Sequence, residues 1–181
     1  VQTCALPILT VFRDQCFSAE LHGHSHVRIA TASLLRNSQF REDGGPTAHP
    51  IQPEEYEAID NFYTTTIYEK GAEVIRILHT LLGEETFQRG MALYVQRHDG
   101  TAATCEDFVQ SLQDAAEASW AEAGERPRFS FAQFRLWYRQ AGTPTVAIRR
   151  HWHQASGTLE LEIRQSTPAT PGQREKHPLV I

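Results

Sequence analysis

The stretch from Tyr68 to Leu82 restricts the fold more than any other part of the sequence. Its apolar residues recur at spacings of three and four, which is the period of one helix face, and Gly83 follows where a C-terminal cap belongs. The residues on that face are Ala72, Val74, Ile75, Ile77, Leu78, Leu81 and Leu82. The pattern predicts a well-buried helix over this stretch.

Two further helices and a loop are indicated on either side of that stretch. Residues 26–38 favour a polar helix, and the Gly- and Pro-rich residues 42–53 should form an ordered loop. Apolar spacing predicts another helix over 85–97, and a turn follows it at Asp99. The rest of residues 9–66 has a mixed pattern that assigns no element.

Capping signals mark the starts of two more helices. Thr104 followed by Asp107 resembles a capping box, in which hydroxyl and carboxylate satisfy free backbone donors, and the helix after it should fray into Ala- and Glu-rich sequence. Ser130 with Gln133 repeats the signal for a helix that Gly142 stops. We therefore expect helices to dominate the chain up to residue 142.

The pattern changes after that point. Residues 145–149 and 158–165 alternate apolar with polar side chains, which is the two-residue period of a half-buried strand. We place a domain boundary here, with a mainly helical part at 9–142 and a β part at 143–181. Two or three strands cannot close a sandwich or barrel. The predicted fold class is therefore α+β, and we expect the chain to end inside an incomplete β domain.

Composition excludes several classes of partner. A content of 40% hydrophobic and 22% charged residues is typical of a globular chain. The net charge of −5 indicates neither nucleic acid nor an anionic membrane as a partner. The longest apolar run, Ala5–Phe12, is far shorter than the roughly 20 residues of a membrane helix. Three widely spaced cysteines indicate neither a disulfide framework nor a thiolate metal site, so a cytoplasmic setting fits best.

Histidines form two groups that deserve weighing as metal ligands. His22, His24 and His26 would converge on a metal if they lay on a strand, and would diverge on a helix. No acidic or thiol ligand follows at a typical spacing, so a solvated polar turn is the favoured interpretation and metal binding the alternative. The same holds for His151 and His153, at the tip of a predicted hairpin.

The segment Tyr68-Glu69-Lys70-Gly71 is the other chemically suggestive group. The chain contains no H-E-x-x-H, G-x-S-x-G, phosphate loop or G-x-G-x-x-G motif, so no self-contained active site is visible. A phenol at a helix start could donate a hydrogen bond to a developing oxyanion. The alternative is a tyrosine packed under a loop, beside an exposed Glu–Lys pair.

Six segments in order carry a resemblance to a known family. They are LTVFRDQ (9–15), AHPI (48–51), NFYTTTIYEKGAEVIRILHTLLGEETFQRGM (61–91), HDGTAATCEDFVQ (98–110), WYRQAGTP (137–144) and STPATPGQ (166–173). Together they resemble the bacterial aminopeptidase N family, zinc aminopeptidases of the gluzincin clan, with a short apparent insertion around 118–128. The resemblance implies the C-terminal half of a thermolysin-like catalytic domain, followed by the first strands of an Ig-like domain.

The resemblance implies roles for three residues. Tyr68 matches the family's catalytic tyrosine, which stabilises the oxyanion formed when zinc-activated water attacks the peptide carbonyl. Tyr63 matches an aromatic residue that lines the pocket for the substrate's first side chain. Asp14 stands where the family has an acidic residue that could orient a ligand histidine without binding the metal itself.

Zinc ligands are what the resemblance fails to find. The H-E-x-x-H helix, and the G-A-M-E-N strand that captures the substrate's amino terminus, would both precede residue 1, and a third ligand, a Glu, would fall at Pro7. We therefore expect residues 1–8 to be foreign to the family. The zinc would belong to a full-length parent, and this chain would supply no ligand to it.

Two hypotheses follow. The first is a fragment of a zinc metallo-aminopeptidase whose parent acts on peptides with a free N-terminus, the isolated chain being inactive without the missing parts of its parent. The alternative is a non-catalytic helical interaction module that has lost the metal site. A fragment should expose an apolar face, whereas an evolved module should be soluble and monodisperse.

Overall fold

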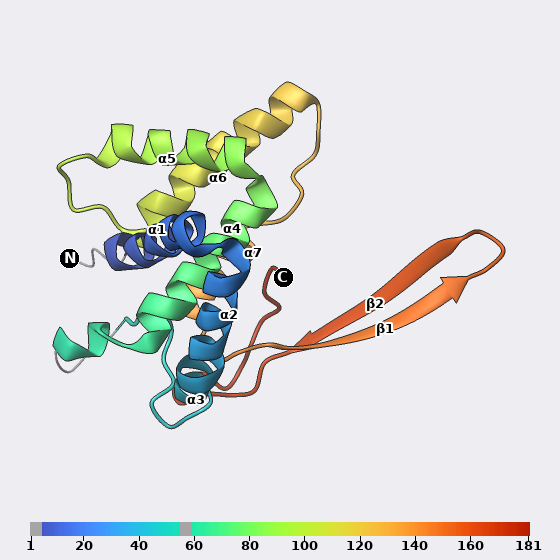
Figure 1. The fold of residues 1–181 in the computed structure, drawn as a ribbon, viewed down its shortest axis with the longest axis horizontal. Helices are drawn as coiled ribbons and strands as arrows, with labels where there is room; N and C mark the ends of the chain where they lie inside the picture. Colours follow the sequence, from blue (N-terminus) through green and yellow to red (C-terminus); the bar gives the residue numbers. More distant parts are fainter. Residues whose placement is uncertain (1–4, 55–58) are drawn as a thin grey trace.

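Helices form the body of the molecule and one β-hairpin projects from it (Figure 1). The computed structural model describes residues 5–54 and 59–181. Its longer helices are α1 (Ala5–His22), α2 (His24–Leu34), α4 (Gly71–Leu82), α5 (Glu84–His98) and α6 (Cys105–Ala123). Shorter ones are α3 (Phe40–Asp43), α7 (Phe131–Phe134) and α8 (Leu136–Arg139), with π-helical turns η1 (Leu35–Gln39) and η3 (Thr66–Lys70) and the 3-10 turn η2 (Ile59–Phe62). The α+β class is confirmed.

Helix α4 is the buried helix that its apolar spacing predicts. Its residues Ala72, Val74, Ile75, Leu78 and Leu82 all belong to the core, and Gly83 follows with a positive φ of 76°. The neighbouring helices cover the other sides of this core. The remaining difference is at the start, where a π-helical turn precedes the regular helix.

Helix α1 is the main element that the sequence pattern misses. It contributes Ile8 and Phe12, both 1% exposed, to the core. Pro7 lies in its first turn, where a missing N–H is tolerated because the first helical donors have no partner within the helix. Ile8 packs against Gly71, so α1 crosses the start of α4 at close range.

Predicted capping explains where the later helices begin. Thr104 and Asp107 form the expected capping box, and α6 runs on to Ala123 without the expected fraying. The Ser130 hydroxyl accepts a hydrogen bond from the Gln133 N–H, but the Gln133 side chain donates to the carbonyl of a C-terminal residue instead of closing the box. Only half of the second capping signal is therefore realised.

The hairpin of β1 (Thr145–His153) and β2 (Thr158–Ser166) corrects one expectation. The strands pair antiparallel with Ile148 opposite Ile163, and their two-residue alternation is real. They are not half-buried: Ile148 is 61% exposed and Trp152 is 63% exposed. The apolar face has no cover because the hairpin leaves the helical body, and no other described element lies on it (Figure 1).

The last residues of the chain return to the helices. Leu179 and Val180 are buried in the core, and the Trp137 indole N–H donates to the Val180 carbonyl over 2.8 Å. The Gln165 side chain also bonds both backbone groups of Leu179, which ties this segment to β2. Of the helices described, none combines the length and apolarity that a bilayer crossing requires.

Candidate functional site

The structure brings Tyr68 and Tyr63 together. Tyr68 lies in the middle of η3 and is half-buried, whereas the Tyr63 side chain is 69% exposed. Their rings stack with centroids 6.1 Å apart and an angle of 25° between the planes. Two phenol rings therefore lie stacked immediately before the start of α4.

The turn that carries Tyr68 is wound as a π-helix. Thr64 holds its beginning, because its carbonyl accepts the Tyr68 N–H over 3.1 Å and its hydroxyl accepts the Ile67 N–H over 3.2 Å. Single π-helical turns within α-helices often mark functional sites, because the extra residue redirects side chains. The π-helical backbone of this turn therefore sets the direction of the Tyr68 side chain.

A second π-helical turn, η1, supports the first. The hydroxyls of Ser38 and Thr65 lie 3.0 Å apart, and the Gln39 amide donates to the Thr66 hydroxyl over 3.4 Å. In the short helix that follows η1, the Glu42 carboxylate accepts the Thr66 N–H over 3.0 Å. Residues on η1 and α3 therefore hold the N-terminal half of the Tyr68 turn.

A buried ion pair holds the C-terminal end of the same turn. Lys70 donates to Asp43 over 2.8 Å, with the two side chains 7% and 0% exposed. Lys70 also donates to the Gly142 carbonyl over 3.1 Å. The alternative that pictured an exposed Glu–Lys pair beside Tyr68 is therefore wrong for Lys70, which is one of the most deeply buried cations described.

Asp43 also accepts hydrogen bonds from two residues about 100 positions later in the chain. Its second oxygen accepts the Gly142 N–H over 2.7 Å, and Thr143 donates its hydroxyl over 2.8 Å. Burial favours neutral Asp43, but the Lys70 charge and these hydrogen bonds outweigh it, so the pKa of Asp43 lies below its ordinary value. Burial lowers the pKa of Lys70, and the Asp43 charge offsets part of that change.

Asp14 reaches the site through the neighbour of Tyr68. It lines, with Glu69, an open cavity of about 430 Å³ between α1 and α2. Burial, followed by the negative charges of Glu73 and Asp14, raises the pKa of Glu69. Within the described residues no hydrogen bond joins Asp14 to Tyr63 or Tyr68. Of the three predicted site residues, the two tyrosines therefore stack on each other, and Asp14 is not bonded to either.

A chain of polar contacts begins at two residues that line this cavity, Gln15 and Glu69. The Gln15 amide donates to Glu69 over 3.3 Å and accepts from Arg76 over 2.5 Å. Arg76 also bonds Glu73, which in turn accepts from Arg28 over 2.6 Å. These contacts connect α1, α2 and α4 with Glu69.

The residues described do not fit a metal ion. Pro7, at the position where the resemblance expects a zinc ligand, has no donor side chain. His22 ends α1 while His24 and His26 lie in α2, so the strand arrangement that would let them converge does not occur. Among residues 5–54 and 59–181, no group of three or more His, Cys, Asp or Glu could hold a metal.

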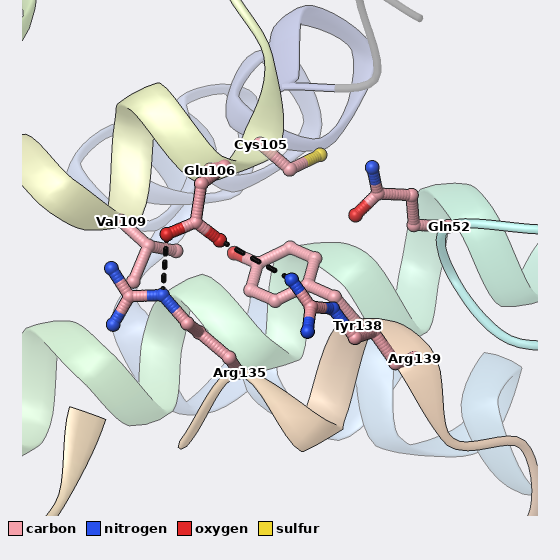
Figure 2. A pocket seen from close by; sticks show the side chains of 7 residues that line it. All are labelled: Gln52, Cys105, Glu106, Val109, Arg135, Tyr138 and Arg139. Atoms are coloured by element: carbon pink, nitrogen blue, oxygen red, sulfur yellow. Dashed lines mark hydrogen bonds and ion pairs between the residues drawn. The ribbon is translucent and has the colours of Figure 1, made fainter. Parts of the chain in front are cut away.

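A small pocket near α6 and α8 is the other cavity of interest (Figure 2). Its volume of about 10 Å³ is the size of a single water, so it cannot hold a substrate. Glu106 spans it and pairs with both Arg135 and Arg139. The buried Tyr138 hydroxyl lies beside it with no hydrogen-bond partner among the described residues.

Sequence patterns miss the residues that hold the Tyr68 turn. One signal was present: Lys70 precedes Val74 by four residues and Leu78 by eight, which places a cation on the apolar stripe of α4. A cation there requires a buried carboxylate. Nothing in the local pattern of residues 38–43 identifies Asp43 as that carboxylate, because the two lie 27 residues apart.

Two parts of the chain match known families. Residues 8–125 match the Peptidase family M1 domain, and residues 142–181 match a domain of unknown function with an Ig-like fold. Aminopeptidase N of Escherichia coli (strain K12) is 50% identical over 173 residues, 96% of this chain and 19% of the relative. Aminopeptidase N of Haemophilus influenzae is 48% identical over 168 residues, 93% and 18% respectively. Aminopeptidase M1 of Arabidopsis thaliana is 35% identical over 137 residues, 74% and 14%.

Proposed function

This chain belongs to peptidase family M1, and we propose that it forms the wall of an aminopeptidase active site that stabilises the oxyanion through Tyr68. The chain spans about a fifth of the length of the bacterial relatives it matches, so the activity of a whole enzyme is part of the proposal. The observation that carries it is the placement of Tyr68 on a π-helical turn, stacked on Tyr63 and held at both ends.

The chemistry assigned to Tyr68 is hydrogen-bond donation. When a nucleophile adds to a peptide carbonyl, the carbonyl oxygen gains negative charge, and a phenol O–H already in place stabilises that charge. The donor must be fixed before the reaction, because reorganising it during the reaction would consume the benefit. The contacts that anchor the Tyr68 turn at Thr66 and Lys70 supply that fixation.

Tyr63 is proposed to line the pocket for the first side chain of the substrate. Its exposed ring is rigid and amphipathic, which suits contact with varied side chains at low entropic cost. The substrates would be peptides with a free N-terminus. Asp14 is proposed to orient a ligand histidine of the complete site, and the open cavity that it lines with Glu69 would give that histidine access to it.

No step of this proposal passes through a metal, because the described residues do not fit one. The chain alone should therefore be inactive. Robust zinc-dependent release of alanine from an alanyl substrate by the purified chain would contradict that expectation.

A chimera tests the role of Tyr68. Residues 9–181 would replace the matching segment of the Escherichia coli relative, so that the host supplies everything before residue 9. We expect an active chimera in which Tyr68→Phe lowers kcat by about 100- to 1,000-fold, the usual effect of losing one oxyanion donor, with little change in KM. Tyr94→Phe, in the core at α5, is the matched control and should leave kcat unchanged. Full kcat in folded Tyr68→Phe, or a folded but inactive chimera, would refute the proposal.

The interaction-module alternative is weakened by exposed apolar side chains. Phe17, Leu21 and Ile29 on α1 and α2 are 61%, 62% and 68% exposed. A fragment of an enzyme is expected to expose such a surface, whereas an evolved interaction module should be soluble and monodisperse. Light scattering with a hydrophobic dye decides between the two, since a monodisperse chain that binds no dye would favour the module. The cytoplasmic location stays a prediction.

A further inference from the structure

The Tyr68 turn is fastened to one short stretch of chain. Four of the six residues 38–43 contact this turn or the residue before it: Ser38, Gln39, Glu42 and Asp43 bond Thr65, Thr66 or Lys70. Three of these contacts are neutral or partly exposed. The fourth, between Asp43 and Lys70, is a buried ion pair, and it is the contact with the least freedom to rearrange.

We propose that Asp43 and Lys70 are positioning residues for Tyr68, and that they set its hydroxyl by locking the rotation of the π-helical turn. This inference rests on the proposed function of Tyr68. Lys70 lies two residues after Tyr68 in the same turn, so any rotation that moves the phenol also moves the ammonium group. Neither residue touches substrate, and both act through Tyr68.

The geometry of Asp43 explains why the lock has one setting. One carboxylate oxygen accepts the Gly142 N–H, and the other accepts both Lys70 and Thr143. Each donor comes from a fixed direction, and the carboxylate is completely buried. A rotated turn would leave an unpaired charge in the core, which costs far more than any gain from the new position. The same carboxylate also registers the turn against the segment that leads into β1.

A double-mutant cycle in the chimera separates positioning from simple stability. We expect Lys70→Met to lower kcat by up to about 100-fold, as misplacement by about 1 Å can, while KM stays nearly unchanged. In a Tyr68→Phe background the same substitution should lower kcat no further, because the group that it positions is already gone. Arg89→Met, which breaks the exposed pair with Glu122, is the matched control and should leave kcat unchanged in both backgrounds.

A second measurement uses the chain itself and needs no activity. Tyrosines carrying carbon-13 at Cζ give one NMR signal each, and Tyr68→Phe identifies the Tyr68 signal. Lys70→Met should shift or broaden the signals of Tyr68 and its stacking partner Tyr63 while that of Tyr94 stays in place. Arg89→Met should move none of the three.

Two outcomes would overturn the inference. One is an equal loss of kcat from Lys70→Met with and without the Tyr68 hydroxyl, which indicates a general structural role. The other is an unchanged Tyr68 signal in the variant. If Lys70→Met fails to fold, Asp43→Asn combined with Lys70→Met removes both charges and is read in the same two assays. An inactive chimera would refute the proposed function alone, since the NMR signals still decide whether Asp43 and Lys70 hold Tyr68.

Discussion

Ile8 lies directly against Gly71, where helix α1 crosses the first turn of helix α4. A Cβ at position 71 would stand 2.8 Å and 2.9 Å from the two γ carbons of Ile8, closer than real side chains approach. The glycine that completes the Tyr68 segment is therefore explained by packing: it lets α1 approach the backbone.

We predict that Gly71→Ala destabilises the chain. Overpacking costs about 1–3 kcal/mol, and the better helix propensity of alanine returns at most about 1 kcal/mol of it. Chemical denaturation measures the change in unfolding free energy. In an Ile8→Ala background the same substitution should be neutral or stabilising, because the γ carbons are gone. Equal destabilisation in both backgrounds would show that Ile8 is not the obstacle.

For a core substitution at Tyr138 we predict the opposite effect, with no loss of stability. It is buried without a hydrogen-bond partner among the described residues, and burial is the main cause that raises its pKa well above the ordinary value. Tyr138→Phe should therefore leave the melting temperature unchanged or raise it. Trp137→Phe is the contrasting control, because it removes a donor to the Val180 carbonyl and should lower the melting temperature. A clear loss of stability in Tyr138→Phe would mean that its hydroxyl has a partner.

Replacing Glu69 by a neutral residue should stabilise the chain in a pH-dependent way. Its pKa is raised in the folded chain by burial and by the charges of Glu73 and Asp14, so the ionised form is less favourable when folded than when unfolded. The contribution of Glu69 to the unfolding free energy is therefore fully present below its unfolded pKa, about 4.3, and is lost as pH rises through its raised folded pKa. Glu69→Gln should melt higher than the parent chain at pH 7, and the difference should vanish below about pH 4. A difference that persists in acid would point to a cause other than charge.

The residue at position 7 should determine how much zinc a longer chimera binds. If the join is moved from residue 9 to residue 5, Pro7 takes the place that the resemblance gives to a ligand Glu. We expect this protein to bind zinc weakly and to be inactive, and Pro7→Glu to restore about one zinc per chain together with activity. Metal content after dialysis is the measurement. Tight zinc binding by the Pro7 form would show that residue 7 is not a ligand position.

Sequence patterns predict those features of this fold that depend on residues close together in the chain. The helix at α4 and the capping box at Thr104 and Asp107 depend on neighbours three or four residues away, and the sequence predicts both, including the end of α4 at Leu82. Helix α1 was missed because Pro7 and an uneven mix of polar and apolar residues obscure its period. Its burial depends on Gly71, more than sixty residues later.

The candidate site divides in the same way. Tyr68 and Tyr63 came from a resemblance, and the structure adds that their rings stack. Asp43 could not be predicted, because a carboxylate at the end of a short helix carries no mark of a partner 27 residues away. The two strands are predicted, but β1 runs to His153, beyond the predicted end at residue 149, so His151 and His153 lie in the strand and not at the hairpin tip. The predicted burial is wrong, since alternation indicates an apolar face and says nothing of what covers it.

The return of Leu179 and Val180 to the helical core has a practical consequence for dissecting this protein. A cut near residue 142, where the match to the Ig-like domain begins, would separate Asp43 from Gly142 and Val180 from Trp137. The start of the Ig-like match is therefore not a point at which the two parts of the chain can be separated without loss of contacts. Anyone who wishes to express the helices alone should keep the last residues attached, through a linker if need be.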